Sequence, residues 1–285
     1  MVILEKLKYI TICYYWTTNN VKLMLQEHYD LPEYKNTVFL LNTYNICDYT
    51  KNDIDFINTH NNIIYYMLEH KLKDNFYTEQ VYQGDSNYFA SLYNAIHYTE
   101  WWTMDYEPQS NKIIRDNLNI PIKYKPVRYT TLIPQVKNIY TAKKTIDFCH
   151  IGTIGSEHRI ELIRKIEYPY CGISLKFISQ SFLNNNNIPE MNASRYILDT
   201  LRIDTIATPN QVRIFELLCM GYTVCTEKCK FNMFPGLVYE WETPEDLIEI
   251  ANRNEYLHPT EAYREMTYTD EAYGQYVNNL IKLQS

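Results

Sequence analysis

Two side chains of opposite charge, Arg213 and Glu216, stand in an otherwise apolar stretch at residues 210–227, NQVRIFELLCMGYTVCTE. The pattern predicts a short helix, a stop at Gly221 and a buried strand. At a spacing of three, both charges project from one helical face. A guanidinium suits phosphate, a carboxylate accepts hydrogen bonds from sugar hydroxyls, and a helix N-terminus adds free N–H groups. The chemistry fits a ligand such as a nucleotide-sugar; the alternative is an ion pair on a solvated helix face.

A second group of candidate residues lies at residues 148–159, FCHIGTIGSEHR, where a predicted strand ends in a turn that opens a helix. Gly152 and Gly155 permit close backbone approach, Ser156 can cap the helix, and Arg159 follows in its first turn. This spacing fits a diphosphate held by backbone N–H groups and one guanidinium. The string is neither a phosphate loop with a following Lys nor a dinucleotide-binding GxGxxG. An ordinary strand–helix turn with a solvated Arg is the alternative.

The elements that must position these residues alternate between strand and helix along the whole chain. In the first half we expect strands at 8–15, 37–41, 62–66, 98–103 and 123–129, and helices at 19–28, 85–96 and 108–118. In the second half we expect strands at 145–151, 174–178, 196–201 and 222–226, and helices at 157–168, 211–220, from 243, and through the tail at 260–283. This alternation predicts α/β architecture with parallel sheets covered on both faces.

The domain prediction follows from length and from one irregular stretch. A chain of 285 residues fits two domains. The polar segment that contains Pro134 interrupts the alternation of strands and helices, so it is the predicted linker. We therefore expect an N-terminal domain at 1–130, a linker at 131–144, a C-terminal domain at 145–259 and a C-terminal helix at 260–285.

Composition narrows the class of protein. A hydrophobic content of 46% with 21% charged residues is typical of a globular chain, and no apolar run is long enough for a membrane span. The N-terminus lacks a signal-peptide pattern and the seven cysteines are scattered, which favours free thiols and a cytoplasmic location. A net charge of −7 disfavours nucleic acid as a partner. Abundant Tyr and scarce Gly are typical of an AT-rich, for example viral, genome.

Neither of two candidate metal motifs is convincing, and we predict no metal site. Asp53 and Asp55 form a DxD pair, but their flanks are polar and a helix start is the more natural interpretation. Cys225 and Cys229 lack the second pair of ligands that a tetrahedral zinc site needs.

Taken together, the two charged motifs resemble the nucleotide-binding domain of glycosyltransferases with the GT-B fold. The likeness is carried by HIGTIGSEHR, SRYILDTL and VRIFELLCMGYTVCTE, with a looser likeness in IIYYMLEHKL, YTEWWTMDY and KYKPVRY. It covers most of the chain, about residues 8–250. The resemblance implies two Rossmann-like domains that face each other across a cleft, and a C-terminal helix that crosses back to the first domain. It also implies a nucleoside-diphosphate sugar, such as a UDP-sugar, as donor, with no further cofactor required.

The resemblance also implies roles for individual residues at the donor site. Gly152, Thr153, Gly155, Ser156 and Arg159 would bind the donor, mainly at its diphosphate. Arg213 would also face phosphate, and Glu216 would accept hydrogen bonds from the ribose hydroxyls. Many retaining members carry a second Glu eight positions before the ribose-binding one, where this chain has Thr208. This departure favours an inverting reaction.

An inverting transfer needs a base that takes the proton of the acceptor hydroxyl. We expect this base at the carboxyl edge of the first sheet. Asp105 follows the strand predicted at 98–103, and Glu69 and His70 follow the strand predicted at 62–66, so all three are candidates. Each could instead be an ordinary loop or cap residue.

The sequence thus predicts an enzyme that transfers a sugar from a nucleoside diphosphate to a hydroxyl, with a saccharide or glycan as the favoured acceptor. Trp101 and Trp102 could stack on a sugar, although aromatic residues more often belong to a core. One alternative is a viral DNA glycosyltransferase that acts on hydroxymethylated bases. Another is a protein of the same fold that binds nucleotides without catalysis.

Overall fold

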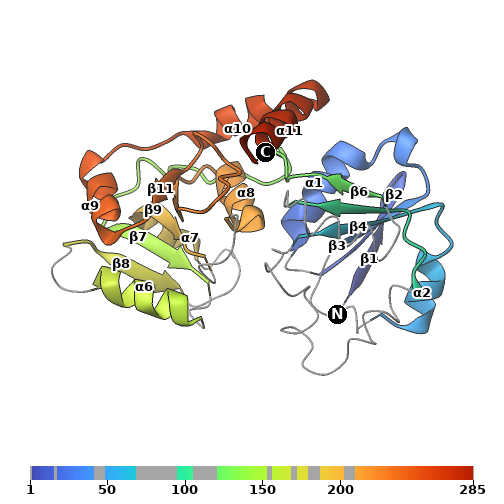
Figure 1. The fold of residues 1–285 in the computed structure, drawn as a ribbon, viewed down its shortest axis with the longest axis horizontal. Coiled ribbons are helices and arrows are strands. Elements are labelled where there is room, and N and C mark those ends of the chain that lie inside the picture. Colours follow the sequence, from blue (N-terminus) through green and yellow to red (C-terminus); the bar gives the residue numbers. More distant parts are fainter. Residues whose placement is uncertain are drawn as a thin grey trace. The chain divides into compact units, whose positions relative to one another are not determined.

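The computed structural model describes residues 2–15, 18–41, 49–68, 95–104, 121–152, 156–167, 172–178, 187–201 and 209–284 (Figure 1). The chain divides into two compact units, one of Met1–Leu132 with Gln284–Ser285 and one of Ile133–Leu283. Each unit has its own sheet. The helices predicted at 85–96 and 108–118 lie almost wholly outside the described residues.

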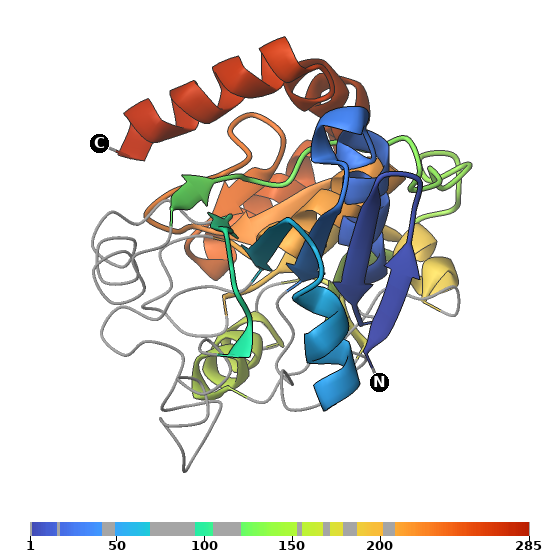
Figure 2. The same cartoon turned by 90° about the vertical axis from the view of Figure 1, so that its right-hand side faces the viewer.

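The first unit contains a six-stranded sheet in the order β1-β2-β3-β4-β5-β6. The strands are β1 (Ile3–Lys6), β2 (Ile10–Tyr14), β3 (Thr37–Leu41), β4 (Asn62–Met67), β5 (Glu100–Thr103) and β6 (Ile122–Tyr124). β1, which the sequence did not predict, pairs antiparallel with β2 (Figure 2), and the other pairs are parallel. The described strands follow chain order without the reversal of a doubly wound sheet, so this unit departs from the Rossmann-like order that we expected.

The core of the first unit lies on both faces of its sheet. Helix α1 (Asn19–Tyr29) places Tyr29 against Phe39 and Trp102, with ring centroids 5.9 and 5.0 Å apart. On the opposite face, Ile57 of helix α2 (Lys51–Ile57) packs into a cluster that includes Trp101. A short 3-10 helix, η2 (Pro32–Tyr34), precedes β3. Both tryptophans are therefore core residues, because neighbouring side chains of a strand point to opposite faces.

Two local predictions for the first unit can be tested. Thr50 and Asp53 form a capping box at the start of α2, with the Thr50 N–H 2.8 Å from the Asp53 carboxylate. This confirms the predicted helix start at Asp53. The strand predicted at 123–129 is too long, because β6 ends at Tyr124. Pro126 has no N–H to donate to a sheet ladder.

The second unit contains a five-stranded, wholly parallel sheet in the order β11-β10-β9-β7-β8. Its strands are β7 (Ile146–Ile151), β8 (Leu175–Ile178), β9 (Ser194–Asp199), β10 (Val224–Glu227) and β11 (Tyr239–Trp241). The chain goes from β7 outward to β8 and then returns to the other side of β7 with β9. The strand order therefore reverses between β7 and β9, as in doubly wound sheets.

Six helices of the second unit fall within the described residues: α6 (Glu157–Glu167), α7 (Ile188–Ala193), α8 (Gln211–Met220), α9 (Pro244–Arg253), α10 (Pro259–Thr267) and α11 (Asp270–Gln284). α8 ends at Gly221, which has a left-handed φ of 100°, as predicted. The tail forms two helices instead of one. The hydroxyl of Thr269 accepts a hydrogen bond from the Ala272 N–H at 3.2 Å and so caps a new helix.

The segment before β7 has no helix or strand and is bonded to the second unit. The Val136 N–H donates to the Met220 carbonyl at 3.0 Å, and the Tyr140 hydroxyl donates to the Gly221 carbonyl at 2.6 Å. The predicted domain limits and the crossover of the last helix stay predictions.

None of the described helices combines the length and apolar character that a bilayer crossing requires.

Candidate functional site

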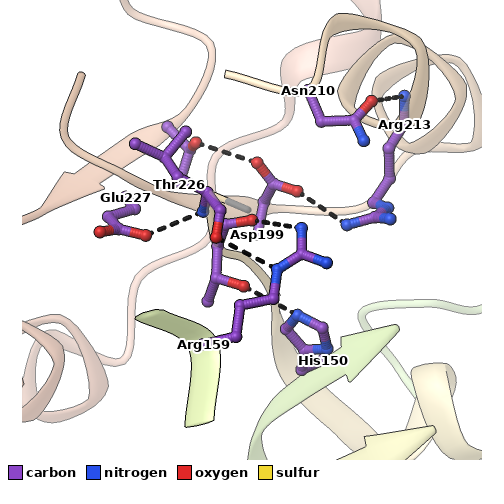
Figure 3. A network of polar contacts seen from close by, with 9 residues as sticks. His150, Arg159, Asp199, Asn210, Arg213, Thr226 and Glu227 are labelled. Atoms are coloured by element: carbon purple, nitrogen blue, oxygen red, sulfur yellow. Dashed lines mark hydrogen bonds and ion pairs between the residues drawn. The ribbon is translucent and has the colours of Figure 1, made fainter. Parts of the chain in front are cut away.

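Polar residues gather at the carboxyl ends of β7, β9 and β10 in the second unit (Figure 3). His150 lies near the end of β7, Asp199 ends β9, and Glu227 ends β10. All three are buried. In open parallel sheets, ligands bind outside the carboxyl ends of the strands at the point where the strand order reverses. In this sheet the strand order reverses between β7 and β9, so a ligand is expected outside the carboxyl ends of these two strands.

Arg213, in the first turn of α8, forms an ion pair with Asp199 across the sheet edge. Its Nη1 lies 3.1 Å from the Asp199 Oδ1; the Asp199 side chain is 0% exposed and that of Arg213 is 14% exposed. The Thr226 hydroxyl donates to the other carboxylate oxygen at 3.3 Å. Asn210 caps α8 by accepting from the Arg213 N–H at 3.2 Å. Two neighbouring strands and one helix start therefore fix the guanidinium.

Glu216 lies one turn further along α8 and is about nine-tenths buried. The alternative of an ion pair on a solvated helix face is therefore wrong for Arg213 and Glu216. Asp199, the actual partner of Arg213, was missed in the sequence. The available signal was a carboxylate at the end of an apolar strand, in SRYILDTL. The ligand-binding roles of Arg213 and Glu216 stay predictions.

Gly152 brings the turn after β7 into contact with α8. Its φ is 144°, which side chains of L-residues rarely adopt. A Cβ built there would lie 3.1 Å from Arg213 Nη2 and 3.4 Å from His150 Cε1. The two charged motifs of the sequence thus meet at the sheet edge. Thr153 and Gly155 lie outside the described residues.

We expect Gly152→Ala to lower the free energy of unfolding by about 1–3 kcal/mol, because alanine is strained at this φ and its Cβ crowds the Arg213 guanidinium. Urea denaturation of the full chain measures the change. Gly274→Ala is the matched control, because no atom lies within 4 Å of a Cβ built there. An equal effect of both substitutions would contradict the strain at Gly152.

Arg159 uses its guanidinium within the protein. It is 6% exposed, its Nε donates to the Leu201 carbonyl at 3.1 Å, and its Nη2 donates to the Thr200 carbonyl at 2.8 Å. The Ser156 hydroxyl accepts from the Arg159 N–H at 3.3 Å, as expected of a capping serine. Arg159 therefore holds the chain where it leaves β9. This geometry favours a positioning role and excludes the solvated Arg of the alternative interpretation.

His150 is a buried imidazole that we did not single out in the sequence. Its Nε2 lies 2.9 Å from the Thr200 hydroxyl, and its Nδ1 has no hydrogen-bond partner in the described part of the chain. Burial, with a contribution from the charges of Arg213 and Arg159, lowers the pKa of His150 to about 3. The ring is therefore neutral near physiological pH.

A second imidazole, His158, lies in the first turn of α6 and pairs with Glu227. Its Nε2 lies 2.7 Å from Glu227 Oε1. The other carboxylate oxygen accepts from the Leu201 N–H at 2.8 Å. Glu227 thereby links α6 to the ends of β9 and β10. The sequence analysis singled out neither residue.

Asp105, Glu69 and His70, the candidate bases, lie outside the described residues, as does Thr208. Across the described ranges, no group of three or more His, Cys, Asp or Glu side chains could hold a metal ion. The described cysteines, Cys13, Cys149, Cys219, Cys225 and Cys229, are free thiols.

The site defines an α/β unit with a polar cluster at its topological reversal. No protein-family model and no curated protein matches the sequence. Among solved structures, the pneumococcal O-GlcNAc transferase GtfA in complex with UDP and GlcNAc matches with a TM-score of 0.45 and 10% identity over 87% of this chain. The GtfA/B complex matches with a TM-score of 0.38 and 7% identity over 87% of this chain. The chain covers 57% of each matched chain. Both are distant neighbours.

Proposed function

We propose that this protein transfers a sugar from a nucleoside-diphosphate donor to a hydroxyl acceptor. The observation that carries the proposal is the contact between Gly152 and Arg213 at the strand-order reversal. A glycine turn and a fixed guanidinium at this edge suit a diphosphate, because backbone and cation can both approach its oxygens.

The ion pair with Asp199 supports this role for Arg213. One guanidinium nitrogen, Nη1, is bonded to the buried carboxylate. A guanidinium has five N–H donors, so several remain for a second acceptor, and the first contact holds them in one orientation. Glu216, on the same side of α8, would accept from the ribose hydroxyls. The donor would thus be held by phosphate and ribose contacts from one helix and one turn.

In the proposed reaction, the bond between the anomeric carbon and the diphosphate oxygen breaks while the acceptor oxygen bonds to that carbon. The acceptor proton passes to a base, for which Asp105, Glu69 and His70 are the candidates. The nucleoside diphosphate departs with the bonding electron pair. We favour inversion, a UDP-sugar as donor without further cofactor, a saccharide or glycan as acceptor, and a cytoplasmic site of action, the host cytoplasm if the protein is viral.

Donor binding is the first test. We expect UDP to bind the full chain in isothermal titration calorimetry, and Glu216→Gln to weaken binding about 10–100-fold, because a hydrogen bond to a charged group contributes about 1.5–3 kcal/mol. Glu249→Gln, at an exposed position of α9, is the control and should leave the affinity unchanged. Absence of binding for UDP, GDP, ADP and dTDP alike, or equal affinities of both variants, would overturn the proposal.

Measurements of turnover distinguish the saccharide acceptor, the DNA acceptor and the nucleotide-binding protein without catalysis. Release of free UDP from UDP-sugars, with saccharides or with hydroxymethylated duplex DNA as acceptors, distinguishes the favoured acceptor from the DNA alternative. Tight donor binding with neither transfer nor hydrolysis would favour a nucleotide-binding protein without catalysis.

A further inference from the structure

His150 has no role in the donor contacts proposed above, yet it lies at the same edge of the sheet (Figure 3). We propose that His150 is a positioning residue of the donor site, whose hydrogen bond to Thr200 keeps Arg213 oriented toward a phosphate oxygen of the donor. Because the His150 side chain is fully buried, it acts through Arg213 and does not touch the donor itself. The inference rests on the proposed function and assigns a further residue to its donor site.

The path from His150 to Arg213 runs through two consecutive residues at the end of β9. His150 Nε2 lies 2.9 Å from the Thr200 hydroxyl oxygen. Thr200 follows Asp199 in the chain, and the Asp199 carboxylate lies 3.1 Å from Arg213 Nη1. A shift of Thr200 would therefore move the backbone of Asp199 and the carboxylate that fixes the guanidinium.

The imidazole ring also lies close to the guanidinium itself. A Cβ built on Gly152 would lie 3.4 Å from His150 Cε1 and 3.1 Å from Arg213 Nη2. The ring and the guanidinium thus border the same small volume beside Gly152. Loss of the ring's fixed position would let the guanidinium shift, and its N–H groups would no longer be preorganised for an anion.

Thr200 is held at two atoms by two different elements. Its hydroxyl contacts His150 on β7, and its carbonyl accepts from Arg159 Nη2 on α6 at 2.8 Å. The next residue, Leu201, donates its N–H to Glu227 on β10 at 2.8 Å. Side chains from three elements therefore fix the chain where it leaves β9, as expected where a binding site needs a rigid support.

Two properties of the ring favour this role over a purely structural one. Burial, together with the charges of Arg213 and Arg159, lowers the pKa of His150 to about 3, so the neutral ring adds no third positive charge. Its Nδ1 has no hydrogen-bond partner within the described residues, and a buried unpaired nitrogen lowers stability. The variant His150→Phe/Thr200→Val would fill a similar space without an unpaired nitrogen, so packing alone does not require a histidine here.

The test measures UDP affinity by calorimetry and melting temperature for the same variants of the full chain. We expect His150→Phe/Thr200→Val to melt near the wild-type temperature, because removing both partners of a buried hydrogen bond is nearly neutral. Its affinity for UDP should still fall about tenfold, as when one charge-assisted hydrogen bond is misplaced. His150→Gln, whose amide can take the place of Nε2, should retain most of the affinity. Thr200→Val alone should lower the affinity as the double variant does, and it covers the case in which the His150 variants do not fold.

Tyr222→Phe is the matched control, because it removes a hydrogen bond of 2.8 Å between the buried Tyr222 hydroxyl and Asn192 near the amino ends of β9 and β10. It should lower the melting temperature and leave UDP affinity unchanged. A double-mutant cycle with Arg213→Lys tests the path. The loss of affinity caused by His150→Phe should be clearly smaller when residue 213 is already lysine, because the oriented fork of donors is then absent.

The outcomes separate this inference from the proposed function. If wild type binds UDP and the double variant and Thr200→Val bind it equally well, the pair is structural, and this inference fails while the proposed function stands. Additive losses in the cycle with Arg213→Lys, or equal losses for His150→Gln and His150→Phe, would also overturn it. If wild type binds none of UDP, GDP, ADP and dTDP, the proposed function fails and this inference fails with it.

Discussion

Replacing Arg213 by methionine should lower the free energy of unfolding by about 3–5 kcal/mol, the usual cost of removing one partner of a buried ion pair. The reason is the Asp199 carboxylate, which is fully buried and, of its partners in the described ranges, would keep the hydrogen bond from Thr226 alone. Methionine retains most of the side-chain volume, so the effect reports the lost charge more than a cavity. Urea denaturation of the full chain without ligand measures it.

A double-mutant cycle separates the ion pair from other effects. In the Asp199→Asn/Arg213→Met variant the uncompensated charge is gone, so the loss should be clearly smaller than the sum of the single losses. Arg253→Met is the matched control, because Arg253 forms an exposed ion pair with Glu249 at 3.6 Å and such pairs contribute little. Equal losses for Arg213→Met and Arg253→Met would show that Asp199 does not depend on Arg213.

Replacing Arg159 by methionine should cost about 2–4 kcal/mol of unfolding free energy in the protein without ligand, because two buried carbonyls lose their donor. Arg159→Lys should recover only part of this loss. An ammonium cannot reproduce the fork of donors that reaches both the Thr200 and Leu201 carbonyls. Thermal and urea unfolding of the two variants measure the difference.

The same variants decide between two roles for Arg159. An arginine that faces only a phosphate would leave stability without ligand unchanged and would weaken UDP binding instead. Arg164→Met, at an exposed position of the same helix, serves as the control for losing a cation from α6. Wild-type stability in Arg159→Met, combined with weaker UDP binding, would favour the phosphate role over the positioning role.

Much of the second unit could be predicted from local patterns. The helix at 211–220 has the limits of α8, because apolar periodicity and Gly221 both mark its end. In the first unit, β3 likewise has the predicted limits of 37–41, since its residues form a short apolar run between polar segments. Local sequence patterns did not predict elements whose formation depends on pairing with another strand. β1 is a four-residue strand that, among the described strands, pairs with β2 alone, and nothing in its own sequence identifies this partner.

The site was predictable only as two separate halves. Gly152 and Arg213 could be placed at the ends of strands, and the structure brings them together. Asp199 and Glu227 were missed because their roles depend on sheet order. β9 lies between β7 and β10, so its terminal carboxylate meets a helix that belongs to the next crossover. Single-sequence patterns do not contain this order. The pKa of His150 is lowered mainly by burial and further by two arginines from different helices, so it too depends on the assembled sheet edge.

The margins of the first sheet have a consequence for how the molecule behaves at high concentration. Among the described strands, the outermost are β1, of 4 residues, and β6, of 3 residues. Glu5, Lys6 and Lys123 place charges on these margins. Short, charged edge strands present few unpaired backbone N–H and C=O groups to another molecule. Without β1, the strand β2, which is buried along its whole length, would itself become an exposed edge strand. The hairpin that β1 makes with β2 therefore protects the protein against lateral self-association and the growth of intermolecular β-structure.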